Sequence, residues 1–152
     1  MKNSLSLEEI YNLAYKTLTK GGSCSEQSNA VAQTIMSAEQ DGSVSHGLFR
    51  LPGYFNSLKS GKVNLNPNPS LHKVTKAVLK CDGDRSFAPL IHKLYLKELI
   101  QSTKEIGIGI LSVQRVAHFA SLWPETETLA ESGLIGIACT SCLLYTSPSP
   151  RD

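Results

Sequence analysis

The chain has 152 residues, of which 41% are hydrophobic, 18% charged and 7% aromatic. This composition is typical of a globular domain and excludes a disordered tail, a collagen and a coiled coil. The formal net charge of +2 argues against a strongly basic nucleic-acid binder. No apolar run approaches the roughly 20 residues that a membrane span requires, and four cysteines are too few for a disulfide scaffold. We therefore expect a cytoplasmic domain with no nucleic-acid or membrane partner.

Three helices are predicted in the first part of the chain. Ser6 and Glu9 have the spacing of a capping box, and apolar residues follow at helical intervals until a glycine pair. Ser25 is placed to cap a second helix, which ends at an Asp-Gly pair. A third helix follows with Pro52 in or near its first turn, where proline is tolerated. The Gly- and Pro-rich residues 61–70 are typical of a loop.

Strands and helices alternate in the second part of the chain. The predicted elements are a strand at 74–79 that ends in the turn 82–84, a helix at 87–105, a strand at 108–113, a helix at 123–132 and a strand at 135–140. This order predicts an α/β fold with a helical N-terminal layer followed by alternating strands and helices.

Residues 142–152 do not continue this pattern, because an apolar, strand-like run gives way to a Ser- and Pro-rich segment. The segment resembles a transposon-end sequencing adaptor translated in frame, and a natural disordered C-terminus is the alternative. Segments left by cloning or sequencing are set aside from fold reasoning. We therefore expect residues 1–141 to be the native part and the front of a longer protein, and 142–152 to be a non-native tail.

One candidate site lies at Ser45, His46 and Arg50. On a helix, positions four apart share a face, so His46 and Arg50 are expected to point into one volume. A histidine exchanges a proton near neutrality, and a guanidinium can clamp a carboxylate through two hydrogen bonds. Together they suit a small 2-oxo or 2-imino acid. The alternative is a purely structural helix start with a surface arginine and a half-buried histidine.

A second candidate site is the segment from Val113 to Pro124, which leads from a predicted strand into a predicted helix and in which His118 adds a polar tip and Trp123 a stacking face. Loops at this position bind ligands in many α/β proteins, and a helix N-terminus offers free N–H groups to an anion. The alternative is a buried packing loop. The glycines at 107 and 109 do not form a dinucleotide fingerprint, since they precede a strand and lack the third glycine. No metal site is expected.

These segments resemble a known family. Residues 41–54, with their S-H-G-x-x-R motif, are similar to the N-terminal signature of the malate/L-lactate dehydrogenase family that lacks a classical Rossmann fold. The string H-F-A-S-L-W-P-E at 118–125 resembles the Δ1-piperideine-2-carboxylate/Δ1-pyrroline-2-carboxylate reductase branch. The resemblance runs through residues 5–141, with Arg85 and Ser86 standing where the pattern has Asn-Gly.

The resemblance implies an incomplete malate/lactate dehydrogenase-like fold, with residues 1–141 as the N-terminal part of an oxidoreductase domain. The implied reaction is the reduction of a cyclic 2-imino acid to L-pipecolate or L-proline with NADPH or NADH. His46 matches the proton donor of the family, Ser45 matches a serine in a relay with an Asp that lies beyond Ser141, and Arg50 matches the residue that binds the substrate carboxylate. The implied cofactor contacts are His118, Phe119, Ala120, Ser121 and Leu122.

The resemblance further implies a homodimer when the protein is complete, and we expect the present chain alone to be inactive. Two other functions stay open at this point. One is a dehydrogenase for malate, L-lactate or ureidoglycolate within the same family. The other is a non-catalytic interaction module that is complete at about residue 141.

Overall fold

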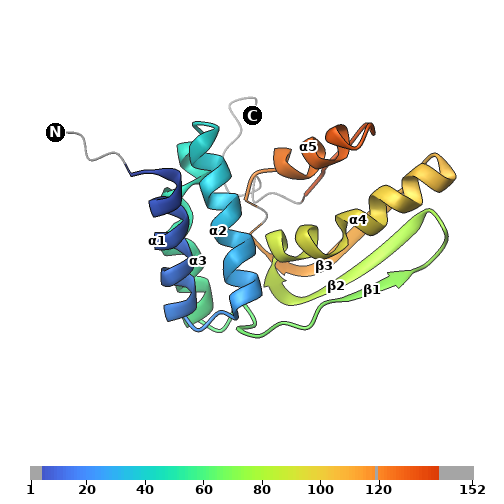
Figure 1. Cartoon of the computed structure of the whole chain (residues 1–152). Helices are drawn as coiled ribbons and strands as arrows, with labels where there is room; N and C mark the ends of the chain where they lie inside the picture. The colour runs from blue at the N-terminus through green and yellow to red at the C-terminus, as the bar shows by residue number, and fades with distance from the viewer. Residues whose placement is uncertain (1–4, 119, 141–152) are drawn as a thin grey trace, which may run out of the picture.

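In the computed structural model, which describes residues 5–118 and 120–140, a layer of helices stands beside a three-stranded sheet (Figure 1). The helical layer contains α1 (Leu7–Lys20), α2 (Ser25–Gln40), the 3₁₀ turns η1 (Val44–His46) and η2 (Leu48–Arg50), and α3 (Leu51–Lys59). The sheet and its helices are β1 (Ser70–Lys73), β2 (Val78–Phe87), α4 (Ala88–Ile106), β3 (Ile110–Ala117) and α5 (Trp123–Glu131). The predicted α/β class with a helical N-terminal layer is confirmed.

The start of α1 follows from its capping residues. The Ser6 hydroxyl accepts a hydrogen bond from the Glu9 backbone N–H, and the Glu9 carboxylate accepts one from the Ser6 N–H. The prediction that Ser25 caps α2 is wrong by one residue, because Cys24 occupies the N-cap position. The Cys24 N–H donates to the Leu65 carbonyl at 2.8 Å, so a contact with the loop between α3 and β1 fixes where α2 begins.

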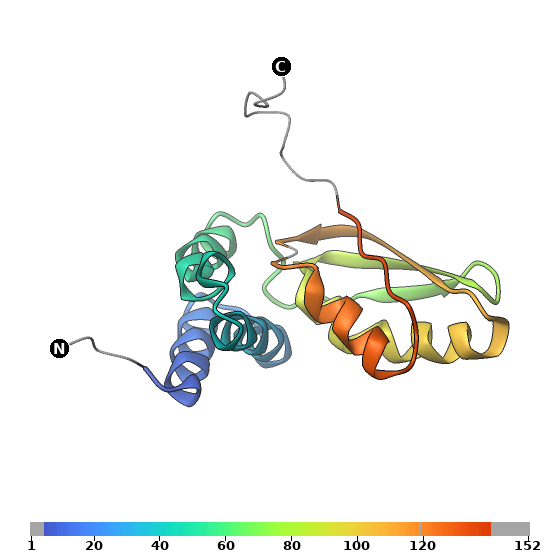
Figure 2. The same ribbon diagram turned by 90° about the horizontal axis from the view of Figure 1, so that it is seen from above.

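The sheet has the order β1-β2-β3, with β1 antiparallel and β3 parallel to β2. The α4 helix forms the crossover between the two parallel strands, and α4 and α5 lie on the same face of the sheet (Figure 2). The apolar residues of that face form a cluster with residues from both helices, which contains Leu79, Leu99 and Leu129.

The strand predicted at 74–79 is shifted in the structure. The Val74 N–H donates to the Val78 carbonyl at 2.9 Å, so this segment turns between β1 and β2, and β2 begins at Val78. Residues 82–84 were predicted as a turn but lie inside β2, at an irregularity in its register with β3 between Asp82 and Ser86. The sequence pattern does not predict β1, which is four residues long and mostly exposed.

The strand predicted at 135–140 is not formed. Ile135 and Ile137 are 97% and 86% exposed, and within residues 5–118 and 120–140 no strand pairs with this segment. Apolar alternation alone therefore does not produce a strand without a hydrogen-bonded neighbour. Residues 133–139 instead line one side of a cavity of about 710 Å³, whose other lining residues include Leu99, Leu111 and Leu129.

Gln27 joins the helical layer to the sheet. Its side chain is fully buried in α2, and its Oε1 accepts a hydrogen bond from the Phe87 N–H at 2.9 Å. Its Nε2 lies 3.1 Å from both the Ser23 Oγ and the Asn64 carbonyl oxygen, to which it donates. The Gln27 side chain thus provides hydrogen-bond partners for the Ser23 hydroxyl, the Asn64 carbonyl and the Phe87 N–H, which lie in three different segments.

No helix in the described part of the chain combines the length and the apolar character needed to cross a membrane. The proposed non-native tail at 142–152 lies outside the described residues, as does Phe119.

Candidate active site

The segment that carries His46 and Arg50 is not one α-helix, so the predicted i, i+4 relationship is wrong. The residues lie instead in the successive 3₁₀ turns η1 and η2, which meet at Gly47. Gly47 has a ψ of −137°, which interrupts a helical path. The Leu48 N–H, which follows it, donates to the Glu39 carboxylate of α2 at 2.7 Å.

The His46 ring is held at one of its nitrogens. Its Nδ1 lies 3.2 Å from the Ser43 Oγ and 3.1 Å from the Ser45 Oγ. Within residues 5–118 and 120–140, its Nε2 forms no hydrogen bond with the protein. A hydroxyl both donates and accepts, so Nδ1 keeps a partner whether or not it carries a proton. This arrangement suits a histidine that gives up and regains a proton at Nε2. The Ser43 contact was not predicted.

Arg50 is exposed, and one of its guanidinium nitrogens is engaged. Its Nε donates to the Ser45 carbonyl oxygen at 3.0 Å, which ties the arginine back to the turn that carries His46. In the described part of the chain the terminal nitrogens of the guanidinium form no hydrogen bond. These two nitrogens are the pair that can bind a carboxylate in the bidentate geometry.

His118 follows β3 and packs into the helical layer. Its ring centroid lies 5.0 Å from that of Tyr54 and 5.8 Å from that of Phe87. Burial lowers the pKa of His118 from its ordinary value, and the charges of Arg50 and Lys62 lower it further. The imidazole is therefore neutral at neutral pH.

A serine of α3 holds the ring of His118. The Ser57 Oγ lies 2.9 Å from the Gly53 carbonyl oxygen and 2.7 Å from the His118 Nε2. Which of the two groups donates to the other depends on the tautomer of the imidazole.

The segment after β3 has an irregular backbone. His118 and Ala120 have φ values of 50° and 56°, a conformation that non-glycine residues rarely adopt. Ser121 is 4% exposed, and its Oγ has no hydrogen-bond partner among the described residues. Leu122 is half-buried at the N-cap position of α5. The predicted cofactor loop therefore offers an unsatisfied hydroxyl beside a helix start.

The two predicted sites meet through Trp123, the first residue of α5. Its indole N–H donates to the Asp41 carboxylate at 2.9 Å. Its ring meets the His46 imidazole edge to face, with centroids 5.8 Å apart and planes at 81°. The structure thus brings the segment that follows β3 against the turn that carries His46.

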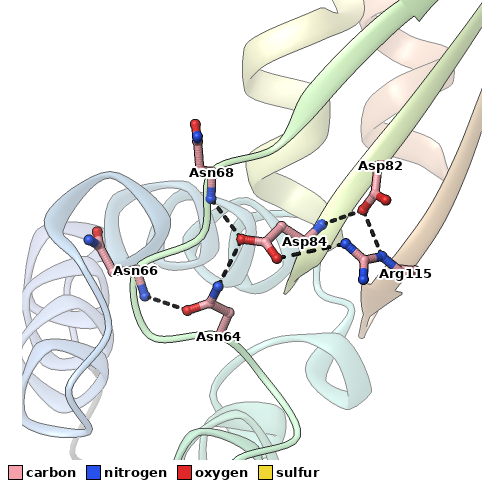
Figure 3. Close-up of polar contacts among 6 residues, drawn as sticks. All are labelled: Asn64, Asn66, Asn68, Asp82, Asp84 and Arg115. Carbon is pink, nitrogen blue, oxygen red and sulfur yellow. Dashed lines mark hydrogen bonds and ion pairs between the residues drawn. The ribbon is translucent and has the colours of Figure 1, made fainter.

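A polar cluster that sequence reasoning missed lies at the register irregularity of β2 (Figure 3). The Asp84 carboxylate accepts hydrogen bonds from the Asn64 side chain at 2.8 Å and the Asn68 N–H at 3.0 Å. Arg115 of β3 donates from its Nε to the Asp82 carboxylate at 2.8 Å. Hydrogen bonds from the Asp84 N–H and then from Arg115 lower the pKa of Asp82. The cluster fastens residues 64–68 to the paired strands, and three alternate asparagines were its signal in the sequence.

These positions can be compared with known proteins. A sequence model described as malate/L-lactate dehydrogenase matches residues 5–149. The chain belongs to this family. Solved structures of family enzymes share the fold as well. A Δ1-piperideine-2-carboxylate reductase from Pseudomonas syringae pathovar tomato superposes with a TM-score of 0.83 and is 33% identical in sequence. The superposition covers 87% of this chain and 40% of that one. A malate dehydrogenase from Pyrococcus horikoshii superposes with a TM-score of 0.78 at 27% identity, over 85% and 37% of the respective chains.

Two curated relatives of this family member are imino-acid reductases. A Δ1-pyrroline-2-carboxylate reductase of Ancylobacter novellus is 39% identical, over 95% of this chain and 46% of that protein. A Δ1-pyrroline-2-carboxylate/Δ1-piperideine-2-carboxylate reductase of Pseudomonas aeruginosa is 33% identical, over 95% and 43% of the two chains. The chain thus spans less than half the length of these relatives.

Proposed function

We propose that the protein to which this chain belongs reduces a cyclic 2-imino acid with NADPH or NADH. The substrate is Δ1-piperideine-2-carboxylate or Δ1-pyrroline-2-carboxylate, and the product is L-pipecolate or L-proline. The observation that carries the proposal is the pairing of His46 and Arg50 on successive turns, tied together by the Arg50 hydrogen bond to Ser45. The imino-acid reductases among its relatives favour this substrate class.

Arg50 is the proposed substrate-binding residue. Its Nε is already occupied by the Ser45 carbonyl, so the guanidinium plane is oriented before a ligand arrives. The two terminal nitrogens then bind both oxygens of the substrate carboxylate. This contact also fixes which end of the small ring faces His46.

His46 is the proposed proton donor. From its imidazolium form it gives the Nε2 proton to the ring nitrogen of the imine, while the substrate carbon accepts a hydride. Ser45 and Ser43 hold Nδ1 through this change, since their hydroxyls accept from Nδ1–H when the ring becomes neutral. Ser45 is also the residue through which a relay to a later Asp is proposed to run.

The segment from His118 to Leu122 is the proposed cofactor-contacting loop, and Phe119 and Ala120 are included on the family resemblance alone. A nicotinamide cofactor supplies the hydride when it is bound. The buried, unsatisfied Ser121 hydroxyl fits a polar ligand at this place, because a buried donor without a partner is unusual in proteins. The neutral, Ser57-bonded His118 adds a polar ring without adding charge.

The test uses the full-length gene product with Δ1-piperideine-2-carboxylate and each nicotinamide cofactor. His46→Gln is expected to lower kcat by about 10²- to 10⁴-fold, the range of general acid catalysis. Arg50→Met raises KM for the carboxylate substrate with little effect on cofactor binding, while Lys59→Met on α3 is the matched control for loss of a surface cation. Wild-type kinetics in both site variants would refute the proposal.

A 2-hydroxy-acid dehydrogenase is the second candidate function, favoured by the structural similarity to the malate dehydrogenase of Pyrococcus horikoshii. The same Arg50 and His46 nitrogens suit a 2-oxo acid, with the proton going to the carbonyl oxygen. A substrate panel of cyclic imino acids, oxaloacetate and pyruvate separates the two functions by kcat/KM. A homodimer, as implied by the family resemblance, is proposed for the full-length protein, and sedimentation measures it directly.

A further inference from the structure

We infer that Trp123 and Asp41 position the His46 imidazole, so that the proton donor is held by the start of the helix that follows the cofactor-contacting loop. This inference rests on the function proposed for His46 but is carried by contacts of its own. It makes Trp123 and Asp41 positioning residues, since the proposed function assigns neither of them a contact with substrate or cofactor.

The indole is anchored to a rigid element. Asp41 is the C-cap residue of α2, and its backbone N–H bonds to carbonyl oxygens of the last turn of that helix. The Trp123 Nε1–H donates to the Asp41 carboxylate at 2.9 Å, across 82 positions of the sequence. A hydrogen bond to an ionised acceptor is stronger than one between neutral groups. The plane of the indole is therefore fixed relative to α2.

The anchored indole packs against the histidine ring. The two rings meet with centroids 5.8 Å apart and planes at 81°, the edge-to-face geometry that aromatic pairs favour. On another atom, the same imidazole is held at Nδ1 by Ser43 and Ser45. Two hydroxyls and one ring thus restrict both torsions of the His46 side chain. The direction of Nε2, the proposed proton-donating atom, follows from these restraints.

The contact also links two parts of the proposed site. Trp123 begins α5 directly after Leu122, the last residue of the cofactor-contacting loop. A displacement of that loop is therefore transmitted to the ring that packs on His46. Arg50 has no contact with Trp123 among the described aromatic and hydrogen-bonded pairs, so substrate binding and proton donation are expected to respond differently when Trp123 is changed.

The kinetic test compares four variants of the full-length protein. Trp123→Leu removes both the hydrogen bond and the ring, and kcat is expected to fall roughly tenfold or more, within the effect of about 10² that a small misplacement can produce. Trp123→Phe keeps an aromatic ring but lacks the N–H, and its kcat is expected to lie between those of Trp123→Leu and wild type. Asp41→Asn keeps an oxygen acceptor for the indole N–H, so its kcat is expected to stay close to the wild-type value. Asp41→Ala has no acceptor, so its kcat is expected to equal that of Trp123→Phe. KM for the imino acid stays at the wild-type value in all four.

A spectroscopic test is independent of catalysis and uses the 152-residue chain. Trp123 is its single tryptophan, and a protonated imidazole in contact with an indole quenches its fluorescence. The emission is therefore expected to fall when acid is added and the imidazole takes up a proton. His46→Gln abolishes this change, while His72→Gln, at an exposed position of β1, keeps it. Asp41→Asn is measured as well, because Asp41 is the other titratable group bonded to the indole.

The outcomes separate the two proposals. If the full-length protein reduces no imino or oxo acid but His46→Gln abolishes the fluorescence change, the proposed function fails and the His46–Trp123 contact stands. If the quenching survives in His46→Gln, or if Trp123→Leu retains wild-type kcat, the positioning inference is overturned. Far-UV circular dichroism of every variant confirms that the fold is kept, and a Trp123→Leu chain that does not fold is replaced in this decision by Asp41→Ala.

Discussion

The carboxylate of Glu39 accepts a hydrogen bond at 2.7 Å from the backbone N–H of Leu48. A side chain of α2 thereby fixes the point at which the turn carrying His46 passes into the turn carrying Arg50. The contact leaves no room beside it, because a Cβ at Gly47 would overlap the Glu39 Oε1. A side chain at position 47 would displace the Glu39 carboxylate, so glycine at this place of the S-H-G-x-x-R motif is explained by a partner outside the motif.

Glu39→Ala is expected to destabilise the protein by about 1–3 kcal/mol, the effect of leaving a partly buried donor unsatisfied. Glu39→Gln retains an oxygen acceptor for the Leu48 N–H and is expected to lie closer to wild type. Urea unfolding measures both values. Gln40→Ala, at the next and exposed position of α2, controls for helix propensity. Equal losses in Glu39→Ala and Gln40→Ala would show that the hydrogen bond contributes nothing.

Gln27→Leu is expected to cost about 3 kcal/mol, because it leaves the buried Phe87 N–H without an acceptor and removes two further hydrogen bonds. The matched control is Gln33→Leu, which lies on the exposed face of the same helix. Its free energy of unfolding should stay close to wild type. A Gln27→Leu protein as stable as Gln33→Leu would contradict the role of Gln27 as the polar link between helices and sheet.

Two glycine substitutions are expected to change stability in opposite directions. A Cβ at Gly83 in β2 would overlap the Val116 side chain and lie 3.1 Å from the Arg115 carbonyl, so Gly83→Ala destabilises by about 1–3 kcal/mol through overpacking. Gly53 lies within α3, and beyond its chain neighbours and the backbone of its own helix no atom lies within 4 Å of such a Cβ. Gly53→Ala is therefore expected to stabilise by about 0.5–1 kcal/mol. Thermal unfolding of the pair tests both signs at once.

His118 is expected to make stability depend on pH. Its folded-state pKa lies below the unfolded value, chiefly through burial. The folded state therefore binds fewer protons, and the stabilising contribution is present above the unfolded value of about 6.5 and is lost as the pH falls through the folded pKa. Urea midpoints at neutral and at mildly acidic pH should differ more in wild type than in His118→Asn. His72→Asn, at an exposed site, should keep the wild-type difference.

Much of the fold could be predicted from local sequence signals, as the capping box at Ser6 and the helices α4 and α5 show. The errors occurred where a distant partner decides the outcome. Asp82 and Asp84 have the composition of a turn, but pairing with β3 and hydrogen bonds from Arg115 and Asn64 keep them in a strand. Residues 135–140 have the pattern of a strand but no neighbour in the described structure.

The candidate site was predicted in its residue types more than in its geometry. Ser45 is hydrogen-bonded both to His46 and to Arg50, but these residues lie on two 3₁₀ turns and not on the single helix that was predicted. No local pattern could indicate that Ser57 bonds to His118, 61 positions away, or that Asp41 holds Trp123. The assignment of catalytic and cofactor roles to these residues stays a prediction, as does the cytoplasmic location.

The strand β2 belongs to both interiors of the molecule. Its last residue, Phe87, is buried in the apolar cluster of the helical layer, and Leu79 near its start is buried in the cluster beneath α4 and α5. Its parallel pairing with β3 is non-local, since the chain has to complete α4 before the two strands meet. Such contacts form slowly compared with the local turns of helices. We therefore expect the pairing of β2 with β3 across α4 to set the folding rate. The helical layer is expected to order earlier, but its backbone amides gain their full protection from hydrogen exchange only when these strands have paired.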